Sequence, residues 1–197
     1  MTLRPTGALV VAGFLGGCVT QAPPRHVALD DAPCVRTIQA LQVHPLPVTA
    51  ERTKVPFMDF ADVGQCLSTN SGKIATALFD LRMVRPPARA GITIQANSAA
   101  TLATAVTLLD SRREPIRRIG FSEFARRGDT FTLDVFVNTS DHDAAYLLLT
   151  PDAAWVGKSD VSMRGESSKG TFKYGFETLS TRQLTDAGKL RIELTPQ

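Results

Sequence analysis

The sequence predicts an all-β protein, an antiparallel β-sandwich of the jelly-roll or immunoglobulin-like type that carries one short helix. The first observation is that apolar and polar residues alternate from about residue 57 onward, which is the period of half-buried strands. The second is that turn-forming residues separate these alternating segments at intervals typical of a sandwich, at 70–72, 86–87, 97–98, 128–129 and 187–188.

Composition limits the class of protein before any motif is considered. The chain has 197 residues, of which 43% are hydrophobic and 21% charged, so it is long enough for one ordinary domain and its composition excludes wholesale disorder. A net charge of +3 is too small for a nucleic-acid binder, and three cysteines exclude a zinc site built from four. We therefore expect one globular domain with tails.

The first residues are typical of an export signal. A basic start at Arg4 precedes an apolar run at 8–15, which is far too short to span a bilayer. Leu15-Gly16-Gly17-Cys18 resembles a bacterial lipobox, in which the cysteine is acylated and becomes the new amino terminus. An ordinary secretory signal with an accidental cysteine is the alternative. We expect residues 1–17 to be the signal and Cys18 the lipidation site that anchors the chain in the outer membrane, facing the periplasm.

Residues 18–56 are predicted to be the lipidated cysteine, a flexible tether and a lead-in to the domain. Segment 19–33 is rich in proline and in small residues, and prolines continue to interrupt the chain as far as residue 56. Cys34 and Cys66 form an even pair once Cys18 is acylated, so in an oxidising compartment we expect them to form a disulfide. Two free buried thiols are the alternative.

The domain at 57–197 is expected to contain six clear strands. Alternation predicts strands at 75–83, 92–97, 106–110, 130–137 and 190–194, with 130–137 the most regular. The apolar run at 145–150 predicts a central strand. Residues 110–115 predict a turn.

The helix and the loop are predicted from local signals. Thr150, Pro151 and Asp152 resemble the start of a helix, with an N-cap, a proline at the first position and an acidic residue near the helix dipole. We expect this helix to end at Gly157 and a long loop to follow at 158–170. Apolar spacing at 34–41 is compatible with one more short helix.

The order of these elements resembles that of the maltose-operon periplasmic protein family and, more loosely, other bacterial envelope β-sandwich domains. The resemblance covers about 57–197 and depends on Gly72-Lys73, Phe79-Asp80-Leu81, Ile92-Thr93-Ile94 and segments 105–110, 146–150 and 188–192. It implies an all-β envelope protein linked to maltose and maltodextrin uptake, with no established enzymatic activity and no catalytic residues to transfer.

No motif in the sequence predicts an enzyme, a metal site or a cofactor. His142 lies between Asp141 and Asp143, but neighbouring residues on an extended chain point to opposite sides. The sequence contains no G-x-S-x-G elbow, and Ser71-Gly72-Lys73 lacks the other residues of a phosphate-binding loop. A hydrolase would require His142 within reach of a serine and a carboxylate.

Two groups of side chains are candidates for binding. Arginines are concentrated between residues 82 and 127, and the candidate face for an anionic polymer or an acidic partner protein is Arg112, Arg113, Arg117, Arg118, Arg126 and Arg127. Solvated arginines on edge strands are the alternative. Trp155 and Tyr174 are the candidate sugar contacts, because sugar C–H faces pack on aromatic rings.

These observations lead to two functional expectations. The first is a non-enzymatic accessory module that binds an oligosaccharide near an outer-membrane pore. The second is a structural subunit of an envelope assembly that docks through the arginine face. In both cases the partners are the lipid bilayer, through Cys18, and a sugar or an envelope protein, with no nucleic acid.

Overall fold

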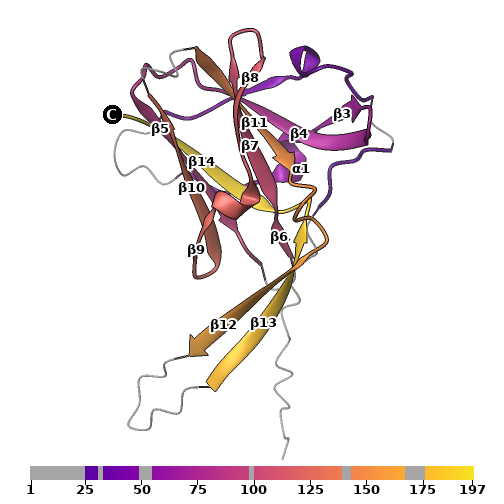
Figure 1. The fold of residues 1–197 in the computed structure, drawn as a ribbon, viewed down its shortest axis with the longest axis vertical. Coiled ribbons are helices and arrows are strands. Elements are labelled where there is room, and N and C mark those ends of the chain that lie inside the picture. Colours follow the sequence, from indigo (N-terminus) through magenta and orange to yellow (C-terminus); the bar gives the residue numbers. More distant parts are fainter. Residues whose placement is uncertain (1–24, 31–32, 49–54, 98–99, 139–142, 167–175) are drawn as a thin grey trace, which may run out of the picture.

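A computed structural model describes residues 25–30, 33–48, 55–97, 100–138, 143–166 and 176–197, with only the backbone described at 162–166 and 176–180. These described residues are mostly β and form three sheets and one short α-helix (Figure 1). This confirms that the protein is mostly β with a short helix, whereas the type of sandwich stays a prediction. Among the described residues, no helix has the length and apolar character needed to cross a membrane.

The first sheet is six-stranded, in the order β1-β4-β11-β7-β8, with β3 pairing on β4. The strand predicted to be central, β11, does lie between β4 and β7. One pair, β1 with β4, is parallel, so the sheet is not purely antiparallel. The strands are β1 Val43–Pro45, β3 Gln65–Thr69, β4 Gly72–Asp80, β7 Thr104–Asp110, β8 Pro115–Ile119 and β11 Ala144–Pro151.

The second sheet is five-stranded and antiparallel, in the order β2-β14-β5-β10-β9. Its long strands are those with the most regular alternation, and one face of each is buried. The strands are β2 Met58–Asp59, β5 Ala88–Gln95, β9 Ala125–Arg127, β10 Thr130–Val137 and β14 Lys189–Pro196.

The third sheet is a long hairpin with a short strand at its base. β12 Ser159–Glu166 pairs antiparallel with β13 Phe176–Thr185, and β13 pairs in parallel with β6 Ala100–Leu102. The prediction of a loop at 158–170 is therefore wrong for residues 159–166, which form strand β12. In Figure 1 this hairpin stands out from the rest of the molecule.

A single apolar cluster joins the two larger sheets. It takes Ala77, Phe79 and Leu147 from the first sheet and Ile92 and Ile192 from the second, all at most 1% exposed. A smaller cluster forms where the lead-in packs against Leu78, Leu109 and Leu148. The other face of the second sheet is therefore exposed to solvent.

The helices differ from the predicted ones. Residues 152–157 form turns rather than a helix, because the Asp152 carboxylate accepts from the backbone N–H of Phe121 at 2.9 Å and is committed to a tertiary contact. The one α-helix is α1 Phe60–Val63, capped by the Asp59 side chain. In the described part of the lead-in, a 3-10 turn forms at Ile38–Ala40, and another, Phe121–Glu123, follows β8.

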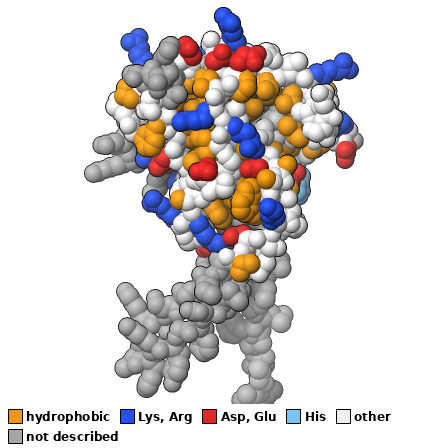
Figure 2. Space-filling model, in the orientation of Figure 1, with side chains coloured by type: hydrophobic (Ala, Val, Ile, Leu, Met, Phe, Trp, Pro, Cys, Tyr) orange, Lys and Arg blue, Asp and Glu red, His pale blue; other side chains and the backbone are white. Residues whose placement is uncertain are grey.

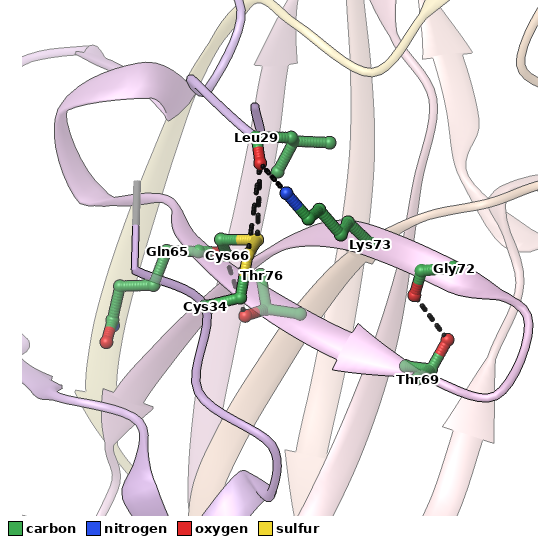
Figure 3. The surroundings of a disulfide bond; sticks show 8 residues. All are labelled: Leu29, Cys34, Gln65, Cys66, Thr69, Gly72, Lys73 and Thr76. Carbon is green, nitrogen blue, oxygen red and sulfur yellow. Dashed lines mark hydrogen bonds between the residues drawn. A yellow bond between two sulfur atoms is a disulfide. The ribbon is translucent and has the colours of Figure 1, made fainter. Parts of the chain in front are cut away.

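The predicted disulfide between Cys34 and Cys66 is present (Figure 3). Cys66 is buried on β3, and the Val35 N–H donates to its carbonyl at 3.0 Å. The Leu29 carbonyl lies 3.9 Å from both sulfur atoms and accepts from the Lys73 ammonium at 2.9 Å. The bond therefore fixes the lead-in to the edge of the first sheet.

Candidate functional site

A shallow polar depression lies on the solvent-facing side of the five-stranded sheet. Its volume is about 140 Å³, and it draws on four neighbouring strands. Side chains that alternate outward along β5, β10 and β14 form most of it, because residues two apart in a strand share a face. The lining residues are Arg89, Gly91, Ile92, Thr93, Arg127, Thr132, Asp134 and Glu193.

Gly91 forms the floor of this depression. In the sheet register it lies directly between Asp134 on β10 and Glu193 on β14. A Cβ atom added at Gly91 would lie 3.4 Å from the Asp134 Oδ1, which is ordinary contact, so a side chain is permitted there. A glycine inside a strand weakens the strand and often marks a place where another group approaches closely. The missing side chain is what opens the surface between the two carboxylates.

Each carboxylate beside Gly91 has an arginine partner on the same face. The Arg89 Nη1 lies 3.7 Å from the Asp134 Oδ1, and the Arg191 Nε lies 3.1 Å from the Glu193 Oε1. All four side chains are between 26% and 52% exposed, and three of them, those of Arg89, Asp134 and Glu193, line the depression. A set of fixed donors and acceptors of this kind suits a ligand that carries several hydroxyl groups.

Phe136 adds an apolar surface next to the polar groups. It is two residues beyond Asp134 on the same face of β10 and pairs across the strands with Arg89. Its side chain is 44% exposed, and its carbonyl accepts from the Arg117 guanidinium at 3.0 Å. An exposed aromatic ring beside carboxylates and arginines matches the two needs of a sugar, a flat apolar face and hydrogen bonds.

The sugar contacts expected from sequence are placed elsewhere or not described. Trp155 packs on the core, with its ring 5.9 Å from that of Phe121 and the Lys158 ammonium 4.9 Å from its centre. It is half-buried and both contacts reduce the ring surface open to a ligand. Tyr174 lies outside the described residues, as do Cys18 and His142.

Several candidate arginines make contacts within the protein. Arg113 donates to the carbonyls of Ile38, Gln39 and Leu41, and its guanidinium lies over the Tyr146 ring. It therefore fastens the lead-in to the β7–β8 turn, which its own φ of 66° helps to close.

The other arginines are divided among different parts of the surface. Arg118 pairs with Asp152 and Arg126 with Asp160, whereas the structure records no side-chain partner for Arg112 and Arg127 among the described residues. On the face in Figure 2, basic side chains are dispersed among acidic and apolar ones and do not form one block. Arg127, which lines the depression, is the candidate that the structure brings to the site.

A larger cavity, of about 350 Å³, lies beside the disulfide. Its lining is mostly small and apolar, and it has no charged side chain. The Gln65 amide at its edge is already used, accepting from the Gln42 N–H at 2.7 Å and donating to the Gln42 carbonyl at 2.8 Å. No charged side chain lines the cavity and its polar side chain is already hydrogen-bonded, so we favour the depression at Gly91.

Sequence analysis placed Arg127 in its candidate arginine face and included Arg89 only in the arginine-rich segment 82–127. The other lining residues come from three strands, β5, β10 and β14, far apart in the sequence, and most of them resemble ordinary outward positions of a half-buried strand. The one available signal was Gly91, a glycine preceding the regular Ile92 and Ile94 alternation. In the part of the chain that the structure describes, no three His, Cys, Asp or Glu side chains are grouped so as to hold a metal.

The fold and the site together define a mostly β protein with a polar, glycine-floored depression on one sheet. Comparisons of this chain with family models, with curated proteins and with solved structures found no match.

Proposed function

We propose that this chain is a lipid-anchored, non-catalytic accessory module of a bacterial outer membrane, facing the periplasm, whose antiparallel sandwich binds an oligosaccharide. The observation that carries the proposal is Gly91, flanked in register by two carboxylates and close to the exposed Phe136 ring. The lipobox at Cys18 supports the anchor, and the Cys34–Cys66 disulfide supports an oxidising compartment.

Maltodextrins are the first ligands to test, because the family resemblance connects the chain with maltose uptake. The depression is smaller than the roughly 300–1,000 Å³ of pockets that enclose a whole small molecule. We therefore expect it to hold one sugar unit of a longer chain and to bind weakly, without closing over the ligand. An open site that leaves the sugar in water also suits hand-over better than chemistry.

The substitution Gly91→Thr is expected to abolish this binding without destabilising the domain. Threonine fills the floor between Asp134 and Glu193, while its strand preference exceeds that of glycine, so Tm should be equal or higher. Titration calorimetry with maltodextrins of increasing length should show at least a tenfold loss. Gln95→Thr, outward on the same strand, is the matched control and should bind normally.

The substitution Phe136→Ala is expected to weaken binding roughly 2- to 12-fold, which corresponds to about 0.5–1.5 kcal/mol for a lost aromatic contact. Because the ring is 44% exposed, stability should change by less than about 0.5 kcal/mol. Trp155→Ala, measured in the same titration, distinguishes this site from the one expected from sequence. If Trp155→Ala loses binding and Phe136→Ala does not, the sugar binds at Trp155 and not at the depression.

The second candidate is a structural subunit that docks an envelope protein or an anionic polymer. The observation in its favour is that Arg112 and Arg127 are exposed and have no side-chain partner among the described residues. The thermal shift of the domain with peptidoglycan fragments and lipopolysaccharide, compared with maltodextrin, separates the two functions. A rise in Tm with the anionic ligands alone would favour docking, provided that the double variant Arg112→Gln, Arg127→Gln no longer shows it.

A further inference from the structure

The hairpin of β12 and β13, here called the arm, is supported by the body only at its base. The two strands form eight registered pairs, from Ser159 with Gln183 to Glu166 with Phe176. A third strand, β6, reaches β13 only at Gln183–Thr185. Among the described residues no other strand pairs with the rest of the arm, which projects from the molecule (Figure 1). A two-stranded hairpin alone in water is only marginally stable, so a projecting arm of this length suggests a further contact.

The base of the arm is fixed to the body by two ion pairs. Arg126 on β9 contacts Asp160 on β12 at 2.8 Å, and Asp129, after β9, contacts Arg182 on β13 at 2.5 Å. The Arg182 side chain is only 5% exposed. Burying such charges is costly, and their best attested role is to select one geometry rather than to add stability. The two ion pairs therefore fix the orientation of both strands of the arm relative to β9 and Asp129.

The open edge of β12 can be assigned from its hydrogen bonding. The Val161 carbonyl accepts from the Arg126 Nη1 at 3.5 Å, so it points away from β13. Backbone groups alternate in an antiparallel pair, so residues 161, 163 and 165 present N–H and C=O groups to this edge. The Val161 carbonyl is already bonded to Arg126, whereas no described strand pairs with the groups of residues 163 and 165. Edge groups that no strand occupies are a template for another strand. Val161 itself is 59% exposed.

The charges on the arm differ from those on the other open edges. β8 begins with a proline and carries Arg117 and Arg118, and β9 carries Arg126 and Arg127, features that discourage edge pairing. The two strands of the arm hold two basic residues, Arg164 and Arg182, and three acidic residues, Asp160, Glu166 and Glu177. With a net charge of −1, two arms can approach each other without strong repulsion.

We propose that the arm is a self-association surface, on which β12 of one copy pairs antiparallel with β12 of a second copy. An edge paired with its own copy about a two-fold axis is self-complementary, so one sequence satisfies both sides. The product is a four-stranded sheet that joins two bodies and satisfies the edge groups of both β12 strands. β13 is the poorer edge, because β6 already occupies its base.

The test is sedimentation of the mature chain, residues 18–197 carrying Cys18→Ser, over roughly a hundredfold range of concentration. We expect a reversible dimer. Val161→Lys should weaken the dimer at least tenfold, because a lysine on an edge strand opposes pairing. Ile116→Lys is the matched control, an exposed β-branched residue on the open strand β8, and should leave the dimer intact.

Single cysteine substitutions at residues 161–164 then test the pairing itself. β12–β12 pairing about a two-fold axis predicts that one or two adjacent positions form intermolecular disulfides, whereas Ile116→Cys forms none. A chain that stays monomeric at the highest concentration overturns the proposal. Binding of an unrelated strand-forming peptide by such a monomer would not rescue it, because the proposed partner is a second copy of the chain. A dimer that Ile116→Lys and Val161→Lys weaken equally overturns it as well.

Discussion

Removing the Cys34–Cys66 disulfide is expected to lower the free energy of unfolding by about 3–4 kcal/mol. The bond closes a loop with a sequence separation of 32, and a loop of this length restricts the unfolded chain by about that amount in the chain-entropy model. Cys34→Ala with Cys66→Ala avoids a free thiol and replaces the buried Cys66 by a small apolar residue. For a domain of this size, Tm should fall by roughly 10 °C.

Urea unfolding of this double variant, beside the reduced native protein, measures the effect. The non-covalent part of the same junction is tested by Lys73→Met, which removes only the donor to the Leu29 carbonyl and should cost less than about 1.5 kcal/mol. If the double variant unfolds within about 1 kcal/mol of the native protein, the bridge from Val35 to Leu67 and the apolar contacts of the lead-in fix this segment without the disulfide.

The elements that the sequence predicted correctly are those with one buried and one exposed face. β10 and β14 were predicted at 130–137 and 190–194 and lie at Thr130–Val137 and Lys189–Pro196. In both, every second side chain enters the core, and this burial is what the alternation records. A different signal, a continuous apolar run, predicted β11 as central, since such a run requires cover on both sides.

The elements that were missed lack this contrast between faces. β12 shows no alternation, and among the described residues no third strand pairs with most of the hairpin that it forms with β13. α1 is four residues long, too short to show a helical period. The depression at Gly91 was missed for another reason: its residues are ordinary outward positions on separate strands, and only the sheet register places Asp134 and Glu193 on either side of the glycine.

The predicted helix start at 150–152 failed because a tertiary contact outweighed a local preference. Asp152 is 4% exposed, and its carboxylate accepts from the Phe121 N–H at 2.9 Å, the Ala154 N–H at 3.3 Å and the Arg118 guanidinium at 3.2 Å. These bonds connect the end of β11 with the turn that leads into β9. The acidic residue expected near the dipole of a helix instead joins two distant segments of the chain.

Asp152→Asn is expected to lower the free energy of unfolding by about 2–4 kcal/mol, because the amide nitrogen cannot accept the bond that one carboxylate oxygen accepts. Burial by itself raises the pKa of Asp152, but the Phe121 and Ala154 N–H groups and the Arg118 charge outweigh it and hold the pKa below its usual range. The stabilisation is therefore present above the ordinary aspartate pKa of about 3.9 and is lost as pH falls through the lower folded-state pKa.

Urea unfolding of the native chain and of Asp152→Asn, from pH 7 to about pH 2.5, tests this directly. Above about pH 5 the difference between them should be constant, and it should shrink as the native carboxylate becomes protonated. Asp62→Asn is the control, since Asp62 is 56% exposed and its pair with Arg25 should contribute less than about 1 kcal/mol. If the difference in the free energy of unfolding stays constant to the lowest pH, the negative charge of Asp152 does not cause it. The shape of the side chain would then explain the loss of stability in Asp152→Asn.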